Sequence, residues 1–279
     1  MKLMVYEEWI DSIHEKDGIN KDRERQMRYE VVSFMTSYGI FFKLPQVTIA
    51  KGITIFHQVS KQISFKKFDR ILFGGVCVFL ASKLDDHPKP IKEFIKAFDY
   101  MHSIHKKQML KNASNPHFEA SYAEITEDGY KAYKIDSKKQ ADLEEKFTGT
   151  EIEILKMIGY DLVIELPYHH LENLKNSILA LDVNFFKTAS TFLNDSMRTI
   201  LCLYYEPRVI ALAAVNLTSA YYNYKLPQLE NHKEWFTIFG EDIGMDIIEE
   251  VSLQIMDIYK RFTFLSSWFK EIFLYANER

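Results

Sequence analysis

The sequence predicts an all-α fold built from two tandem five-helix units. Turn residues are sparse, because the 279 residues include only 10 Gly and 7 Pro, so helices have room to be long. Apolar residues recur at helical spacing, and β-branched residues form no alternating runs of the kind that strands need. Hydrophobic residues make up 47% of the chain, which supplies enough apolar surface for the two cores expected at this length.

The first half of the chain carries the signals of five helices, which follow an N-terminal helical extension over residues 1–20. Pro45 and Pro90 suit a first helical turn, where a missing amide donor costs nothing. Gly39 and Gly159 stand where a helix would end in a left-handed residue. The predicted helices span residues 21–38, 45–60, 69–84, 90–98 and 137–158.

The range 99–134 lies between the fourth and fifth predicted helices and is dense in Lys, His, Asn and Glu. It shows no sustained apolar period, so we expect a surface insertion that contributes nothing to the core. With this insertion, the first unit is expected to span residues 21–162.

A second set of five helices is predicted in the other half, after an extended linker that ends at Pro167. This second unit is expected to span residues 163–262, and residues 263–279 are expected to form a C-terminal helical extension. The predicted helices span residues 168–181, 185–203, 207–224, 233–239 and 243–262.

The two halves share a common register. Leu80 and Leu217 are 137 residues apart (217 − 80 = 137), and the same offset relates a further set of positions. In each half the third helix mixes small residues with large apolar ones, so neighbouring helices can approach it closely and it is predicted to be the buried centre. The alternative is an accidental register between ordinary amphipathic helices. The further pairs are Phe56 and Leu193, Phe68 and Tyr205, Asp69 and Glu206, Gly74 and Ala211, and Pro90 and Pro227.

Charge and hydropathy exclude several classes of function. A net charge of −4, with a pI near 6.2, is opposite to the clustered Lys and Arg excess that nucleic-acid binding requires, so a protein partner is expected instead. The N-terminus carries Glu7 and Glu8 and no apolar signal segment, and no run of about 18 uncharged apolar residues occurs. We therefore expect neither secretion nor insertion into a membrane.

The residues that common catalytic motifs require are missing. Phosphate-binding loops, serine elbows and helical zinc motifs are absent from the sequence, so no enzyme activity, cofactor or metal site is expected. Cys77 and Cys202 both lie in apolar stretches and are expected to be buried thiols.

Several segments together resemble a cyclin. Residues 79–86, with the sequence Phe-Leu-Ala-Ser-Lys-Leu-Asp-Asp, resemble the third helix of a cyclin box, and residues 151–162 resemble its fifth helix. Residues 192–196 and 205–207 are similar to the second box of the transcription-associated cyclins. Within that group the chain looks most like cyclin L, at residues 43–47, 56–57 and 235–240.

The resemblance implies a cyclin fold, in which each five-helix unit is a cyclin box. It also implies a non-catalytic regulatory subunit that forms a heterodimer with a cyclin-dependent protein kinase and activates it, for transcription or RNA processing. Localisation to the nucleus is expected, with the cytoplasm as a second compartment. The alternative is a TFIIB-like double-repeat transcription factor that binds DNA, but that class carries basic helices and a zinc ribbon with two CxxC pairs, and this sequence has neither.

The resemblance assigns candidate kinase-binding residues in the first box. Lys83 matches the lysine of the third helix and Glu151 the glutamate of the fifth, a pair that holds the regulatory helix of the kinase. Lys83 ends an otherwise apolar helix, so its stem can lie on the bundle while its ammonium group projects at the rim. Asp85 and Asp86 follow at the same helix end and join this set; because adjacent helical residues point about 100° apart, they are not expected to act as an acid–base pair.

A second candidate site is a substrate-docking patch. Met27 and Arg28 resemble the start of the Met-Arg-Ala-Ile-Leu docking motif of the cell-cycle cyclins. Glu30 occupies the isoleucine position of that motif and puts a charge where the docking groove is apolar. The residues of the expected patch are Met27, Arg28, Val31 and Phe34.

Overall fold

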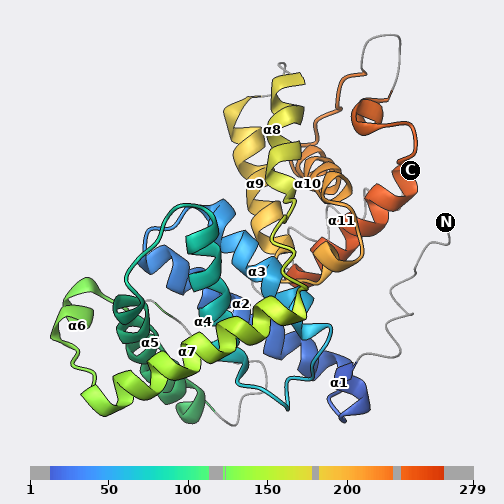
Figure 1. The fold of residues 1–279 in the computed structure, drawn as a ribbon. Helices are drawn as coiled ribbons and strands as arrows, with labels where there is room; N and C mark the ends of the chain where they lie inside the picture. The colour runs from blue at the N-terminus through green and yellow to red at the C-terminus, as the bar shows by residue number, and fades with distance from the viewer. Residues whose placement is uncertain (1–12, 113–121, 123, 178–181, 229–233, 261–279) are drawn as a thin grey trace. The chain divides into compact units, whose positions relative to one another are not determined.

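The structure is a computed structural model, and it describes residues 13–112, 122, 124–177, 182–228 and 234–260. Throughout these residues the regular secondary structure is helical and no strand occurs, which confirms the predicted all-α class (Figure 1). The chain divides into two compact units between Ile164 and Glu165. The C-terminal extension expected over residues 263–279 lies outside the described residues.

Polar side chains fix where helices of the first unit begin. Asp69 accepts hydrogen bonds from the backbone amides of Ile71 and Leu72, at 3.1 Å each. Asp136 accepts one from the amide of Lys139 at 3.0 Å, in the first turn of the unit's last helix. The helices of this unit are α1 (Ile13–Lys16), α2 (Lys21–Phe41), α3 (Gln46–Ser60), α4 (Arg70–Leu84), α5 (Ile91–Lys111), α6 (Glu127–Ala132) and α7 (Ser137–Met157).

Helix α4 is the buried centre of the first unit, as its small residues predicted. It packs against α2, α3 and α7. A Cβ atom on Gly74 would lie 2.8 Å from a methyl carbon of Val31 on α2, and one on Gly75 would lie 2.9 Å from the ring of Phe98 on α5. Side-chain atoms do not fit at such distances, so the two glycines are what allow α2 and α5 to approach α4.

Gly39 does not end α2, contrary to the prediction. The helix continues to Phe41, and the left-handed residue that follows it is Lys43, with φ 57°. A Cβ atom on Gly39 would lie 2.5 Å from Cγ1 of Ile49 on α3, so this glycine serves the close packing of α2 on α3. Gly159, with φ 64°, does follow α7 in the predicted left-handed conformation.

Helix α5 extends well beyond its predicted end at residue 98, as far as Lys111. Met101 and His105 are therefore buried, although they belong to the expected surface insertion. They continue the helical spacing of the buried Phe94 and Phe98, but the polar residues between them conceal that period in the sequence. The expectation that the range 99–134 adds nothing to the core is wrong for these two residues.

The second unit repeats the packing of the first. Helix α10 packs against α8, α9 and α11, just as α4 packs against α2, α3 and α7, so the internal repeat is confirmed. Ala211, Ala213 and Ala214 of α10 are fully buried and take the place of the α4 glycines. The elements are α8 (Pro167–Ser177), α9 (Val183–Ser196), the 3₁₀ helix η2 (Leu201–Leu203), α10 (Pro207–Tyr221), the 3₁₀ helix η4 (Trp235–Phe239) and α11 (Met245–Lys260).

The two cysteines differ in environment. Cys77 is fully buried in α4, as predicted, and burial raises the pKa of its thiol. Cys202 lies in η2, because α9 ends at Ser196 rather than near residue 203. It is only partly buried, so its predicted full burial is wrong.

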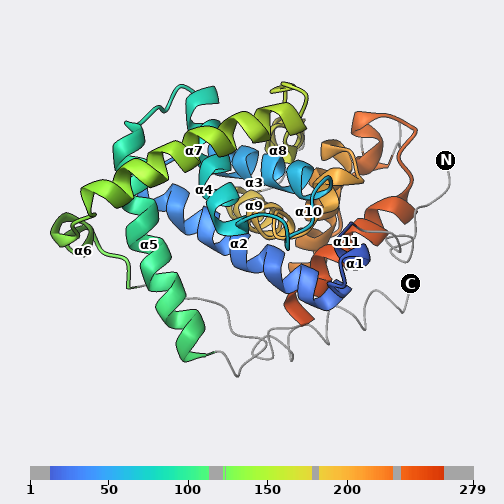
Figure 2. The same ribbon diagram turned by 60° about the horizontal axis from the view of Figure 1, so that its bottom comes forward.

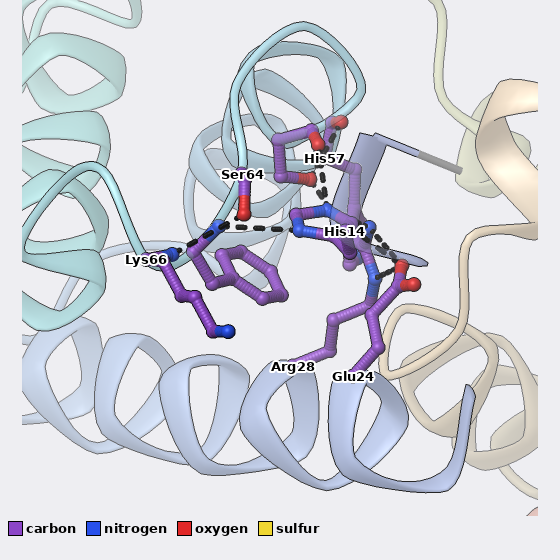
Figure 3. A network of polar contacts seen from close by, with 8 residues as sticks. His14, Glu24, Arg28, His57, Ser64 and Lys66 are labelled. Carbon is purple, nitrogen blue, oxygen red and sulfur yellow. Dashed lines mark hydrogen bonds and ion pairs between the residues drawn. The ribbon is translucent and has the colours of Figure 1, made fainter. Parts of the chain in front are cut away.

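A buried polar network attaches the short helix α1 to the rest of the first unit (Figure 3). The imidazole of His14, 1% exposed, accepts a hydrogen bond at Nδ1 from the backbone amide of Phe65, at 3.1 Å. Its proton is thereby assigned to Nε2, which donates to the carbonyl oxygen of Ser60 at 2.9 Å. With one nitrogen accepting and the other donating, the neutral form of the imidazole makes both hydrogen bonds.

Arg28 is the cation at the centre of this network. Its guanidinium donates to the carboxylate of Glu24 at 2.7 Å and to the hydroxyl of Ser60 at 2.6 Å. One guanidinium nitrogen lies 3.2 Å from Nε2 of His14, and another lies 3.4 Å from Nδ1 of His57. Burial lowers the pKa of His14, and Arg28 lowers it further against the opposing effect of Glu24, because a charged ring would lose its solvation and stand beside a second cation.

Acidification is expected to weaken the first unit through His14. Because the folded-state pKa of His14 lies below its ordinary value of 6.5, its contribution to stability is fully present above that pH and is lost as the pH falls below it. Urea unfolding between about pH 7.5 and 5.5 should therefore show the free energy of unfolding of the wild type falling, by at most about 1.4 kcal/mol per pH unit for this one proton.

The control for this prediction is His14→Gln, which keeps a donor and an acceptor but does not titrate. His102, whose pKa burial lowers to about 4, adds a slope of the same sign to both proteins, so the comparison isolates His14. The advantage of the wild type over the variant should shrink as the pH falls. A constant difference across this range would contradict the prediction.

Two glycine substitutions should have opposite effects on stability. Gly39→Ala places a methyl group against Ile49, so it should lower the free energy of unfolding by about 1–3 kcal/mol. Gly149→Ala, in α7, meets no atom within 4 Å and should raise it by about 0.5–1 kcal/mol, since alanine is the better helix former. Urea unfolding of both variants measures the change in the free energy of unfolding. If the two substitutions change it equally, the packing of α2 on α3 does not require a glycine at position 39.

Candidate functional site

A charged pair joins two helices of the first unit at its surface. Lys83 stands in the last turn of α4 and forms an ion pair with Glu151 of α7, so the structure brings together two residues that are 68 positions apart (Figure 2 shows α7 running beside α4). The Lys83 side chain is 38% exposed and that of Glu151 is 15% exposed. The Lys83 ammonium also lies 4.6 Å from the ring centroid of Phe79, one turn earlier on α4.

Apolar burial, rather than this ion pair, holds α7 against the unit. Phe147 and Ile154 on the inward face of α7 are fully buried, and full burial of such side chains stabilises by about 1.5–3 kcal/mol each. A partly exposed ion pair contributes only about 0.2–1 kcal/mol. Lys83 and Glu151 can therefore change partners without loss of the helix packing.

The outward face of α7 carries a shallow, open hollow next to the charged pair. Ile152 lines it and is 46% exposed, directly after Glu151 in the sequence. A Cβ atom on Gly149 would meet nothing within 4 Å, so the hollow has space for side chains of another molecule. The lining residues are Ala141, Glu144, Glu145, Thr148, Gly149 and Ile152.

The adjacent aspartates at the end of α4 have different environments. The carboxylate of Asp85 accepts a hydrogen bond from the hydroxyl of Thr48 at 2.8 Å and forms an ion pair with Lys51, both on α3. Asp86 is exposed and has the left-handed φ of 56°. Asp85 thus holds the end of α4 on α3, while Asp86 faces solvent. The roles of Thr48 and Lys51 were not predicted from the sequence, although their spacing of three residues puts them on one helix face.

The residues of the expected docking patch lie in the core. Val31 and Phe34 are fully buried, and Met27 and Arg28 are nearly so. Val31 faces Gly74 of α4, and Arg28 is the cation of the buried network described with α1. Because this face of α2 points inward, the four residues have little exposed surface at which a substrate could dock.

Glu30, the charged residue in the docking motif, is buried together with its counter-charges. One carboxylate oxygen accepts a hydrogen bond from Arg70 at 2.6 Å, and the other accepts one from Nε2 of His105 at 2.8 Å. Nδ1 of that histidine lies 2.9 Å from the hydroxyl of Tyr122. Burial opposes ionisation of Glu30, but the bond from His105 and the charge of Arg70 outweigh it and hold the pKa of this carboxyl below its ordinary value.

Metal-ligand groups and membrane-spanning helices are both absent from the described part of the chain. Within it, no three His, Cys, Asp or Glu side chains are grouped so that they could hold a metal ion. No helix in the described ranges has the length and apolar character needed to cross a membrane. The rim of α4 and α7 offers a charged pair beside a partly apolar hollow, which is the chemistry of contact with another protein.

The adjacent aspartates are expected to differ in their effect on stability. Asp85→Ala removes an acceptor of Thr48 and the counter-charge of Lys51, so it should lower the free energy of unfolding by about 1.5–3 kcal/mol. Asp86→Gly puts a glycine at a left-handed φ, where it is unstrained, so stability should stay the same or rise. Urea unfolding compares the two. If Asp85→Ala proves as harmless as Asp86→Gly, the contacts to α3 do not hold the end of α4.

Comparison with known proteins gives one family match in each half of the chain. The family described as "Cyclin, N-terminal domain" matches residues 2–115, and the family described as "Cyclin-T2-like, C-terminal domain" matches residues 172–258. Cyclin-T1-3 of Oryza sativa subsp. japonica is 29% identical over 253 residues, which cover 90% of this chain and 46% of that protein. Cyclin-T1-5 of Arabidopsis thaliana is 30% identical over 247 residues, which cover 88% of this chain and 38% of that protein.

The chain spans less than half the length of these two relatives. Proteins named cyclin K and cyclin L match as well. A chain in the crystal structure of the yeast RNA Pol II CTD kinase CTDK-1 complex has a similar fold, with a TM-score of 0.63 and 13% identity over 86% of this chain and 67% of that one. The chain therefore belongs to the cyclin family, among its transcription-associated members.

Proposed function

We propose that this cyclin is the non-catalytic regulatory subunit of a cyclin-dependent protein kinase, which it binds as a heterodimer and activates. The observation that carries the proposal is the partly exposed ion pair of Lys83 and Glu151 at the rim of α4 and α7, beside the hollow on α7. The chain of similar fold in the CTDK-1 structure is part of a kinase complex, which supports the same function.

Activation of such a kinase is a conformational shift. A cyclin-dependent kinase alone is inactive because the glutamate of its regulatory helix is swung away from the lysine that positions ATP, and because its activation loop obstructs the substrate site. The first unit of the cyclin supplies a preformed surface that favours the inward position of that helix. Binding energy then shifts a two-state equilibrium of the kinase and adds no chemical group.

Lys83 and Glu151 would exchange their mutual ion pair for contacts with the kinase. Opening a partly exposed ion pair costs about 0.2–1 kcal/mol. Truncating one partner of a charge contact buried in an interface typically costs about 2–5 kcal/mol, because the other charge is left buried and unpaired, so these two residues would fix the register of the complex. Ile152 and the rest of the hollow would supply apolar area next to this contact.

The two aspartates have different parts in this proposal. Asp85 acts indirectly, because its contacts with Thr48 and Lys51 fix the helix end from which Lys83 projects. Asp86 is exposed beside it and would contact the kinase itself.

The names of the relatives support a partner kinase of the transcription or RNA-processing group. For this reason we propose that the cyclin is located in the nucleus, with the cytoplasm as a second compartment. The net charge of −4 supports a protein partner over DNA, which disfavours the TFIIB-like alternative. We propose direct contact with neither nucleic acid nor membrane, and no cofactor.

The test is the double variant Lys83→Ala with Glu151→Ala, assayed with a panel of cyclin-dependent kinases. Activation should be lost at protein concentrations near the wild-type Kd, because the contact that fixes the register is gone. The Tm should stay close to that of the wild type, because the partly exposed pair contributes only about 0.2–1 kcal/mol to folding.

A matched control is Asp142→Ala with Lys146→Ala, which removes an exposed ion pair of 2.7 Å from α7, the helix that carries Glu151. This control should activate the kinase like the wild type. A fully active Lys83 and Glu151 double variant would remove these residues from the contact, and a wild type that activates no kinase in the panel would contradict the proposed function itself.

A further inference from the structure

The hollow on the outward face of α7 is a mainly apolar stripe with a carboxylate on each side. Its lining residues repeat at helical spacing from Ala141 to Ile152, so they lie along one face of the helix. Among the described residues that line it, Glu144 and Glu145 are the only charged ones. Because adjacent helical residues point about 100° apart, these two flank the stripe. A molecule that fills the hollow therefore meets both carboxylates.

The rest of the lining requires no hydrogen bond from an occupant. The side chains of Ala141 and Ile152 carry no polar atom, and Gly149 has no side chain. The hydroxyl of Thr148 donates to the carbonyl oxygen of Glu144, one turn earlier in the helix, at 2.9 Å. The two carboxylates are thus the polar side-chain groups of the lining that still need partners.

The chain itself provides no counter-charge in the hollow. The two lining carboxylates form no ion pair with any described residue. Lys146, the lysine next to them in the sequence, forms its ion pair with Asp142 at 2.7 Å. Lys138 and Lys156 lie about one turn beyond the two ends of the stripe, outside the lining. Covering the hollow would take two negative charges out of water, which is unfavourable unless the occupant supplies cations.

The hollow continues into the rim formed by Lys83 and Glu151. Glu144 precedes Glu151 by two helical turns, so both carboxylates lie on the same side of α7, about 10 Å apart along the helix axis. Ile152, which lines the hollow, directly follows Glu151. A kinase that contacts the rim would therefore extend over the hollow, which makes the kinase the occupant.

We propose that Glu144 and Glu145 select the partner kinase by charge, because the kinase segment over the hollow carries Lys or Arg on both sides of an apolar side chain. This inference rests on the proposed function and adds the chemical class of the segment that α7 accepts. The apolar side chain lies on the stripe at Gly149, where a Cβ atom would meet nothing within 4 Å. A kinase with Asp or Glu in this segment is rejected, because like charges would meet away from water.

The test uses the kinase that the wild type activates, and it measures the Kd by biolayer interferometry. Glu144→Gln with Glu145→Gln should weaken binding by about tenfold, and Glu144→Lys with Glu145→Lys by about a hundredfold, since cations of the kinase lose their partners and then meet like charges. Both losses should be larger at about 50 mM than at about 300 mM NaCl, because salt screens the attraction in the wild-type complex.

The matched control is Asp142→Lys with Glu153→Lys. It makes the same change in net charge on exposed positions of α7 that lie outside the lining. It should bind the kinase like the wild type, and all variants should keep the wild-type Tm. An unchanged Kd for the charge-reversed Glu144 and Glu145 variant, or an equal loss in the control, would overturn this inference and leave the proposed function intact. A wild type that activates no kinase would contradict both.

A photocrosslink identifies the kinase segment itself. The cyclin with p-benzoylphenylalanine in place of Thr148 is irradiated in the complex, and the crosslinked kinase residue is located by mass spectrometry. It should have Lys or Arg within about one helical turn on both sides. A crosslink to a segment without such residues, or to one rich in Asp and Glu, would overturn the inference, as would a kinase complex that forms no crosslink at this position.

Discussion

The close approach of neighbouring helices to α4 is the constraint on which the first unit depends. Gly74 and Gly75 lie where a Cβ atom would overlap α2 and α5, so the helix can be enclosed on several sides. Once α4 is enclosed, its residues from Phe73 to Ser82 are buried, and Lys83 is the exposed residue that follows them in the C-terminal turn. In the second unit, buried alanines of α10 give the same enclosure. The repeat in sequence therefore reflects the same arrangement in both units, a central helix enclosed by its neighbours.

Local signals predicted most of the helices because caps, prolines and apolar periods involve residues that are close in the sequence. The prediction failed where a distant contact decides the outcome. Gly39 looks like a helix end, yet it lies inside α2 because Ile49 of α3 occupies the space of its Cβ. Met101 and His105 look like parts of a polar insertion, yet they face the core because α5 continues through them.

The candidate site could be predicted only in part. The family resemblance named Lys83 and Glu151, and the packing of α7 beside α4 explains why they meet although 68 residues separate them. Asp85 points toward α3 because it contacts Thr48 and Lys51 there, and no local pattern in the sequence identifies these two residues as its partners. Likewise, Arg28 carries the docking motif in sequence but belongs to the buried network because His14 brings α1 over it.

The proposed kinase contact at the rim of α4 and α7 can be tested most directly by methyl NMR of isoleucine-labelled cyclin. Ile152 lies in the exposed hollow beside Glu151, whereas Ile154 is buried in the same helix and Ile248 is buried in the second unit. Addition of the kinase should shift the methyl signal of Ile152 most strongly and leave that of Ile248 in place. An unchanged Ile152 signal in a saturated complex would contradict a kinase contact at this rim.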